Sequence, residues 1–404
     1  MTLEPHTSAS NTARSYGSVT KTFHWLTVLL ILTTIPLGII ANGLPYDTSE
    51  ALAFKPFLFS MHKTVGITAF FVVLGRIAWA LSQPKPAGLH PERRAESFLA
   101  ELVHWLLYGS LLLVPITGWI HHASTAGFAP IWWPFGQNLL LVPKSETLAA
   151  LTAGLHIVFE PVLVVSILLH VIGALKHHFI DKDDTLRRLL QGKTEAGTPH
   201  ASNKMVPLVA AVVVWFGAMG IGSALGVYNS QSEIAPVAEL EEVQSDWTVN
   251  SGTLTLSITQ FGSEVSGSFE DWTADITYAE QEGPGSHGSV TAIISIGSLT
   301  LGSVTGQALV PDFFNAEAHP TAEFNAEFMF QADGYTAEGT LSIRGNAVPV
   351  VMPFDLNVEG NEATMSGRLT LDRRDFKIGD NMPDESLLAF GVAVNIDLTA
   401  TRSP

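Results

Sequence analysis

Hydrophobic residues follow two different patterns along the chain, and the change falls near residue 242. Five apolar segments in the first part span residues 23–41, 61–81, 99–121, 148–179 and 206–228. Each is close to the length of about 20 residues that a helix needs to cross a bilayer. Beyond residue 242, apolar and polar residues alternate between glycine-rich turns, as in TLTLSIT and GTLSIRG. Seven or eight such segments predict antiparallel strands in a sandwich or barrel.

These patterns predict a multidomain protein with three parts. The first is an all-α transmembrane four-helix bundle over residues 1–195. The second is one extra transmembrane helix with a polar linker over residues 196–242, and the third is an all-β antiparallel barrel over residues 243–404. The polar N-terminus has no signal-peptide pattern, so we expect the first apolar helix to act as an uncleaved signal anchor.

Composition supports this division. Of the 404 residues, 47% are hydrophobic and 15% are charged, which favours a membrane protein. Residues 1–204 hold 15 Lys and Arg against 12 Asp and Glu, whereas residues 205–404 hold 6 against 26. The acidic second half argues against nucleic acid as a partner, because phosphate binding needs a basic face. The absence of cysteine excludes disulfides, thiolate metal sites and thioether-linked haem.

The distribution of Lys and Arg predicts the orientation in the membrane. Basic residues gather before the first apolar segment, between the second and third, and between the fourth and fifth: Arg14, Lys21, Lys85, Arg93, Arg94, Lys176, Lys182, Arg187, Arg188, Lys193 and Lys204. The loops on the other side hold Lys55, Lys63 and Lys144. By the positive-inside rule the N-terminus is cytoplasmic, and five crossings place the C-terminal domain outside.

Four histidines in the apolar segments form two pairs by membrane depth. His156 and His170 share the fourth segment, and their fourteen-residue spacing is about 21 Å and close to four helical turns. His24 begins the first segment from the cytoplasm, at the depth of His170. His62 begins the second from the outside, at the depth of His156. Two such pairs predict bis-imidazole ligation of iron in two b-type haems held without covalent bonds.

The alternative for a single histidine is a hydrogen-bonded core or interfacial role, but four that pair by depth favour ligation because polar groups in a membrane are costly. Arg76 lies fourteen residues after His62, near the depth of His24, where its guanidinium could bind haem propionates or instead extend to the interface. Lys63 has a weaker case for the same role at the outer site. Five other histidines could each replace one of the four named ligands: His104, His121, His122, His177 and His178.

Residues 16–190 resemble the bacterial cytochrome b561 family of four-helix dihaem membrane cytochromes. The matching pieces are FHWL, MHKTVG, GRIAWAL with QPKP, HWLLYGSLLLVPITGW and LHVIGALKHHFIDKDDTLRRL. The resemblance implies the same ligand set and a bacterial inner membrane. It also implies electron exchange with quinone or, as in some members, oxidation of superoxide with quinone as acceptor.

The chain from Asp246 onward resembles the YceI-like domain, a lipocalin-like barrel family that binds polyisoprenoid lipids such as quinones. The matching pieces are ITQFGSEVSGSFEDW, VPDFFNAEAHPTAEF, GTLSIRGNAVPVVMPF and LTLDRRDFKIG. A barrel of about eight strands is wide enough for side chains or one slender apolar ligand. His319 and the run Arg373, Arg374 and Asp375 have no nucleophile beside them, so we expect hydrogen bonding and salt bridging at the barrel end.

The sequence therefore predicts a membrane dihaem cytochrome that moves electrons between a quinone pool and a donor or acceptor such as superoxide. The periplasmic barrel is expected to bind an isoprenoid quinone, such as ubiquinone, or another isoprenoid lipid. His121, His122 or Lys144 could shape an outer substrate site. Two alternatives stay open: an electron-transfer subunit that needs a separate dehydrogenase or other periplasmic redox partner, and a membrane-anchored isoprenoid-lipid carrier. The sequence is therefore compatible both with a quinone-linked oxidoreductase and with an electron carrier.

Overall fold

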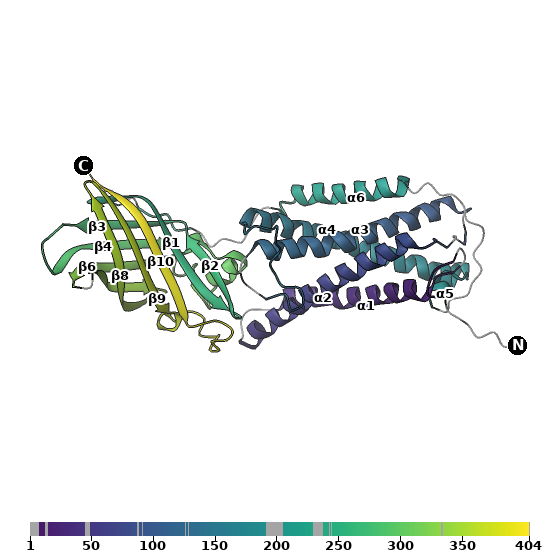
Figure 1. Ribbon diagram of the computed structural model, residues 1–404, viewed down its shortest axis with the longest axis horizontal. Helices are drawn as coiled ribbons and strands as arrows, with labels where there is room; N and C mark the ends of the chain where they lie inside the picture. Colours follow the sequence, from purple (N-terminus) through teal and green to yellow (C-terminus); the bar gives the residue numbers. More distant parts are fainter. Residues whose placement is uncertain are drawn as a thin grey trace. The chain divides into compact units, whose positions relative to one another are not determined.

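The computed structural model describes residues 8–12, 15–44, 49–86, 89–90, 92–125, 127, 129–190, 205–228, 237–241, 243, 245–332 and 334–403. The chain forms two compact units, which we call the helical unit and the β unit. Figure 1 shows the helices in the first part of the chain and the strands in the last.

Among the described residues, five helices are long and apolar enough to cross a membrane. They are α1 (Ser18–Gly43), α2 (Ser49–Ser82), α3 (Arg94–Ser124), α4 (Glu146–Lys176) and α6 (Met205–Ala224). The five predicted transmembrane helices are therefore confirmed. Helix α2 begins twelve residues before the predicted segment, because the turns that precede Met61 are also mostly apolar. A π-helical turn, η1 (His177–Asp181), continues α4, and a short helix α5 (Thr185–Leu190) follows it.

Helices α3 and α4 pack along each other, and residues Val73, Leu111 and Leu163 form a buried cluster from α2, α3 and α4. Helix α6 packs on α3 (Figure 1), where the indole Nε1 of Trp215 donates to Ser110 Oγ at 3.1 Å. A Cβ on Gly109 would lie 2.0 Å from Trp215, so the missing side chain lets the two helices approach. The fifth helix is thus packed on α3 and α4 rather than separate from the bundle.

The β unit is a ten-stranded antiparallel sheet within the described residues, curled into a half-barrel. Its spatial order is β3-β4-β6-β7-β8-β9-β10-β1-β2-β5. The bounds are β1 (Trp247–Gln260), β2 (Ser263–Phe269), β3 (Trp272–Tyr278), β4 (Gly285–Ser295), β5 (Leu299–Thr300), β6 (Thr321–Gln331), β7 (Gly334–Ile343), β8 (Asn346–Glu359), β9 (Glu362–Asp372) and β10 (Gly391–Arg402). The antiparallel lipocalin-like architecture is confirmed.

The strand count exceeds the predicted seven or eight because three elements give weak sequence signals. Strand β2 reads SEVSGSF and is largely polar, β3 reads WTADITY and alternates over only seven residues, and β5 has two residues. Several neighbours are joined by tight hairpins, for example through Phe261 and Gly262 between β1 and β2. Both have positive φ, 49° and 73°, as a two-residue turn that follows the strand twist requires.

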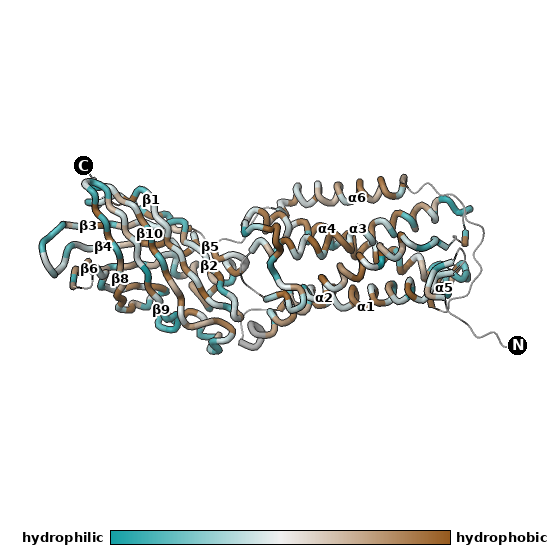
Figure 2. The backbone as a smooth tube through the Cα atoms, viewed as in Figure 1, coloured by the Kyte–Doolittle hydropathy of each residue, from teal (hydrophilic) through white to brown (hydrophobic). Residues whose placement is uncertain are grey.

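Apolar side chains are distributed differently in the two units. Many large ones on the helices are exposed, among them Leu29, Leu32, Ile172 and Phe216. Figure 2 shows the hydrophobic colour running along the membrane helices. In the β unit the alternating strands turn one face inward, and the inward residues form two main buried clusters. Apolar side chains on the outside suit a protein surrounded by lipid. Apolar side chains turned inward suit a protein surrounded by water.

Candidate functional site

Helix α4 presents two imidazoles, and each meets a ring from another helix. The ring centre of His156 lies 6.4 Å from that of His62 on α2. The ring centre of His170 lies 6.3 Å from that of His24 on α1. The structure therefore brings together the same two pairs that depth in the sequence predicts.

The spacing of both pairs suits two imidazoles that bind one metal ion from opposite sides. Metal–imidazole bonds are about 2 Å long, so two rings that share an ion have centres about 6 Å apart. The observed distances of 6.3 and 6.4 Å agree with this arrangement. The residues present thus fit bis-imidazole ligation of a haem iron, and ligation by these four residues stays a prediction.

Backbone carbonyls orient both rings of the His62–His156 pair. The Nδ1 atom of His62 lies 2.8 Å from the carbonyl oxygen of Thr34, and Nδ1 of His156 lies 2.8 Å from that of Val114. A carbonyl only accepts, so each Nδ1 carries the proton and donates it. Each Nε2 then keeps its lone pair, which is the form of imidazole that binds a metal.

Two glycines leave the space that these rings occupy. A Cβ on Gly38 of α1 would lie 2.8 Å from His62 Cε1 and 2.9 Å from its Nδ1. A Cβ on Gly118 of α3 would lie 2.9 Å from His156 Nδ1. Any side chain at either position would push a ring out of place, so the pair depends on residues from all four helices of the bundle.

The His24–His170 pair has different neighbours. Arg76 Nη2 lies 3.4 Å from His24 Nδ1, and the guanidinium also sits over the Tyr108 ring at 5.3 Å. Because arginine only donates, this contact leaves the His24 proton on Nε2. Ligation through Nε2 therefore requires the guanidinium to move to another acceptor, such as a carboxylate of a cofactor.

A third imidazole lies beside this pair. The ring of His104 on α3 is 5.2 Å from that of His170, and its Nδ1 is 2.6 Å from the carbonyl oxygen of Ala100. His104 is therefore the one alternative candidate within the described residues that lies against a predicted ligand ring. Close by, the Arg188 guanidinium sits 5.5 Å over the Tyr16 ring. Burial raises the pKa of the Tyr16 hydroxyl although Arg188 opposes the shift, so this phenol is neutral near pH 7.

The other candidates lie elsewhere in the helical unit. His121 Nδ1 is 2.9 Å from the carbonyl oxygen of Ala149, and its ring packs on His122 at 4.6 Å. Lys63 is buried beside His62. His177 Nδ1 lies 2.6 Å from Asp183 Oδ2. A role for His121, His122, Lys63 or Lys144 in an outer substrate site stays a prediction.

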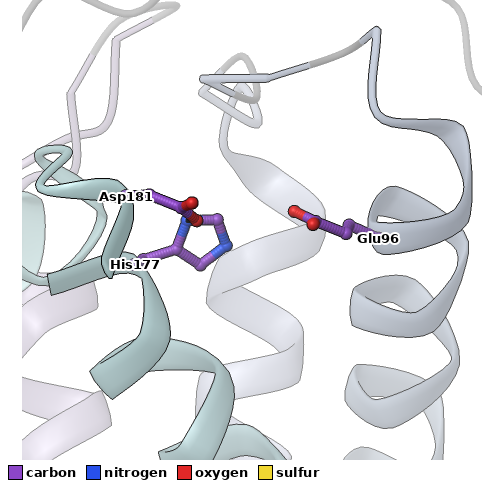
Figure 3. Close-up of side chains that lie close together, drawn as sticks. All are labelled: Glu96, His177 and Asp181. Carbon is purple, nitrogen blue, oxygen red and sulfur yellow. Dashed lines mark ion pairs between the residues drawn. The ribbon is translucent and has the colours of Figure 1, made fainter. Parts of the chain in front are cut away.

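Glu96, His177 and Asp181 gather where α3 meets the end of α4 (Figure 3). Lys176 Nζ lies between two of them, 2.8 Å from Glu96 and 3.0 Å from Asp181. Arg93 contacts the same two carboxylates at 3.3 and 3.1 Å. Two cations already neutralise these acids, so the cluster is an ion-pair network that joins α3 to η1. This network explains the charged run KHHFIDKDD after the fourth apolar segment.

The β unit encloses an apolar cavity of about 250 Å³. Its wall is built from the inward residues of most strands, from Trp247 at one end of β1 to Gln260 at the other. The aromatic residues Phe269, Phe314 and Phe324 are part of this wall. The cavity is the kind of slender apolar space that holds a hydrocarbon chain.

The charged run after β9 contributes to structure, as the sequence suggests. Arg373 is buried and donates to five backbone carbonyls, which belong to Ile378, Gly379, Met382, Leu388 and Ala389. Arg374 pairs with Asp372 at the surface. His319 lines a separate polar groove with Asp312 and Asn381, among others. None of these is arranged beside a nucleophile among the described residues that line the groove.

Sequence reasoning missed Gln260, Gly38 and Gly118. For Gln260 a signal was present, because period two places it on the same strand face as Leu254, Leu256 and Ile258. A polar residue in an apolar register marks an inward polar group. The two glycines had no such signal, since their effect depends on how the helices are rotated against each other.

Residues 15–192 match the family model described as prokaryotic cytochrome b561, and residues 246–400 match the YceI-like domain. Cytochrome b561 homolog 2 of Escherichia coli (strain K12) is 31% identical over 193 residues, which are 47% of this chain and 97% of the relative. Probable superoxide oxidase CybB of Yersinia pestis is 26% identical over 184 residues, which are 45% of this chain and 98% of the relative.

The β unit has similar solved structures. The structure of Burkholderia cenocepacia BcnA is 26% identical, with a TM-score of 0.35, and covers 37% of this chain and 96% of its own. The Campylobacter jejuni YCEI protein is 16% identical, with a TM-score of 0.31, and covers 43% of this chain and 95% of its own. The E. coli relative is matched over nearly its whole length and carries the identification: this chain belongs to the prokaryotic cytochrome b561 family, as a multi-pass inner-membrane protein to which a YceI-like domain is joined.

Proposed function

We propose that the chain binds two b-type haems, one between His62 and His156 and one between His24 and His170. Membership of the cytochrome b561 family implies b-type haem. The observation that supports two is the pair of ring spacings, 6.4 and 6.3 Å, at two positions along one helix. Bound haem supplies reversible one-electron transfer.

Each residue has a defined part in this proposal. Thr34 and Val114 carbonyls hold the His62 and His156 rings with Nε2 presented to the iron. Arg76 binds a propionate carboxylate, which removes its donor from His24 Nδ1 and frees that ring to ligate. The two sites lie about 21 Å apart along α4, so together they carry electrons across the membrane.

The proposed electron partners, a quinone and superoxide, are supported by their electron balance and by the name of one relative. A quinone and superoxide are a balanced pair: two superoxide anions give up two electrons as they become dioxygen, and two protons complete the reduction of one quinone to quinol. One relative is described as a probable superoxide oxidase. In the proposed orientation the N-terminus is cytoplasmic, and the His62–His156 pair and the β unit face the periplasm.

The β unit serves this reaction by holding an isoprenoid quinone or a related lipid in its apolar cavity. The fifth helix and the linker after it, residues 196–242 in the proposed division, keep it attached to the helical unit. This attachment keeps the local concentration of the stored lipid high near the membrane.

Haem content of the full chain in detergent tests the ligand assignment. A pyridine haemochrome assay should give about two haems per chain, and His62→Ala or His156→Ala should each reduce the value to about one with the low-spin spectrum of the other site kept. His178→Ala, whose ring packs on Phe179 outside both pairs, is the matched control and should keep two. Equal loss of both haems from the single variants, or one haem in the parent, contradicts the pairing.

A second measurement tests the reaction. Purified protein with a short-chain ubiquinone should consume superoxide and form quinol in a ratio of about two to one, as the electron balance requires. His62→Ala should abolish this activity. Quinone reduction that needs an added dehydrogenase would instead identify the chain as a subunit for that enzyme.

A further inference from the structure

The loop between α3 and α4 exposes large apolar side chains. Its residues 131–142 read IWWPFGQNLLLV, and the longer stretch 126–143 holds no Asp, Glu, Lys or Arg. Trp133 and Leu141 are each 91% exposed, and Leu140 is fully exposed. Single exposed apolar residues are common on a protein in water, but a loop without charges that exposes three of them indicates contact with another apolar phase.

The loop lies along one face of α2. Phe57, Thr64 and Phe71 follow one another at seven-residue spacing, which places them on the same face of that helix. The Trp132 ring lies 5.5 Å from the Phe57 ring, and the Trp132 N–H donates to Thr64 Oγ1 at 3.0 Å. The Phe135 ring stacks on Phe71 at 5.4 Å. The loop thus follows α2 from Phe57 towards Phe71, a distance of roughly 21 Å along the helix axis.

This course takes the loop back alongside the bundle. Helix α3 ends at Ser124, yet the loop carbonyl of Gly136 accepts a 3.2 Å hydrogen bond from Nε1 of Trp119, which lies five residues inside that end. Trp119 directly follows the glycine that accommodates the His156 ring. The loop therefore reaches back to the level of the His62–His156 pair.

The loop also lies on the lipid-facing side of α2. Phe57 and Phe71 are both about half exposed, although each has an aromatic ring of the loop against it. Phe71 lies well within the apolar span Phe54–Ser82, where exposed apolar side chains face lipid. The exposed surface of the loop is therefore continuous with the lipid-facing surface of the helix.

Irregular backbone is tolerated at membrane depth where it is held against protein rather than exposed to lipid. Two hydrogen bonds hold this loop to α2 and α3, and the Phe135 N–H donates to the Trp132 carbonyl at 3.2 Å. The Asn138 side chain accepts a hydrogen bond from Lys144 Nζ at 3.3 Å. Lys144 is exposed just before α4, where its long side chain can extend to the membrane interface.

We propose that residues 131–142 form a re-entrant membrane segment. The backbone lies against α2 and α3, and the side chains of Trp133, Leu140 and Leu141 lie in the lipid, at the boundary between head groups and acyl chains. Tryptophan is favoured at this boundary because its ring is amphipathic. The segment lies on the side of the membrane that carries the His62–His156 pair. This inference depends on the membrane-spanning helices and not on the proposed redox reaction.

Spin labels test the position of the loop, because the chain has no cysteine and a single introduced one is labelled alone. Leu140→Cys and Trp133→Cys are each made in the full chain, labelled with a nitroxide and reconstituted into phosphatidylcholine bilayers. Power saturation compares collisions of the label with oxygen, which concentrates in lipid, and with a water-soluble nickel chelate. We expect the oxygen-to-nickel ratio at both positions to be several-fold higher than at a position in water.

Two labelled variants supply the reference values. Leu32→Cys on α1 replaces an exposed residue of a membrane-spanning helix and gives the lipid value. Thr253→Cys on β1 replaces an exposed residue on the outward face of the β unit and gives the aqueous value. Leu141→Cys is a further loop variant, should Trp133→Cys not fold, because the Leu141 side chain is almost fully exposed.

Loop labels whose ratio is closer to that of Leu32→Cys than to that of Thr253→Cys support the inference. A ratio equal to that of Thr253→Cys overturns it, because the loop then lies in water. Labels that neither reagent reaches also overturn it, since protein then covers the loop, either the β unit or a second copy of the chain. Haem content does not enter these outcomes, so failure of this inference is distinct from failure of the proposed function.

Discussion

The helical unit and the β unit place apolar side chains on opposite sides of their backbones. Large exposed hydrophobic residues cover the helices, whereas Val351 is the one such residue within the described part of 245–403. The interiors differ in the reverse sense. The bundle encloses paired imidazoles, and the half-barrel encloses an apolar cavity. The surrounding medium, lipid or water, therefore determines which side chains lie at the surface. The interior is not bound by that requirement and can be adapted to a ligand.

The units also differ in whether their buried polar side chains are paired. In the helical unit the Nδ1 protons of His62 and His156 are bonded to backbone carbonyls, so the rings are oriented before any metal arrives. In the β unit Gln260 Oε1 has no partner in the described chain. The polar atoms of the imidazole pair are thus paired within the protein, whereas this buried acceptor is not.

The largest expected effect is in the β unit, at Arg373. Arg373→Met keeps an apolar stem but removes the donors of five backbone carbonyls. Several of these acceptors would then be buried without partners, so the free energy of unfolding of the β unit should fall by at least about 3 kcal/mol. Calorimetry of the full chain would show its transition at a much lower temperature, with the haem spectrum unchanged.

Arg374→Met is the control, because this neighbour lies at the surface and pairs with Asp372 there. It should lower the unfolding temperature of the β unit only slightly, because an exposed ion pair contributes little. Similar losses from both variants would show that Arg373 acts through its charge rather than through its hydrogen bonds.

The next effect is in the helical unit, at Gly38. Gly38→Ala places a methyl carbon 2.8 Å from His62 Cε1, so the ring must leave its bond to Thr34 or the helices must separate. Overpacking of this kind costs about 1–3 kcal/mol. Haem per chain should fall from about two towards one.

Gly173→Ala in α4 is the matched control, since a Cβ there meets nothing within 4 Å. Alanine is the better helix former, so this variant should be neutral or slightly stabilising. Equal haem content in the two variants would show that the His62 ring can move without losing its ligand.

The smallest effect is a pH dependence in the β unit. The hydrogen bond from the Arg374 side chain lowers the pKa of the Asp372 carboxyl below its usual range. Its folded-state pKa lies below its unfolded one, so the stabilisation is present above about pH 4 and is lost as pH falls through the folded value. Both side chains are partly exposed and screened by solvent, so the effect is small.

Arg374→Gln should therefore lower the unfolding temperature of the β unit slightly at pH 7. The difference in unfolding temperature from the parent should vanish at a pH well below the pKa of an ordinary Asp. A difference that is unchanged across this range would place the effect of Arg374 in its packing on Phe390, where its guanidinium lies 3.8 Å over the ring.

Much of this fold was predictable because bilayer thickness and strand alternation impose regular lengths and periods. The apolar segments gave the membrane helices, and the fourteen-residue spacing of His156 and His170 gave two depths on one face. The short strands β2 and β5 were not predictable, because their pairing with neighbours rather than their composition makes them strands. The six-residue helix α5 is likewise too short for a periodic signal.

The sites were predictable only in part. Residue types and depth suggested which imidazoles meet, but the Arg76 contact with His24 and the closeness of His104 to His170 depend on helix rotation. The same holds for Gly118, where the missing side chain matters only because His156 occupies its space. Contacts between helices are set by tertiary packing, which the sequence of one helix does not contain.

Helix α4 sets the separation between the two histidine pairs. Because His156 and His170 stand on one helix, the distance between them along its axis is set mainly by helix geometry and little by how neighbouring helices shift. Inserting or deleting a single residue between them would turn one ring by about 100° around the axis, away from its partner. The length of this stretch can therefore change only by about a whole number of turns if both rings are to keep their partners.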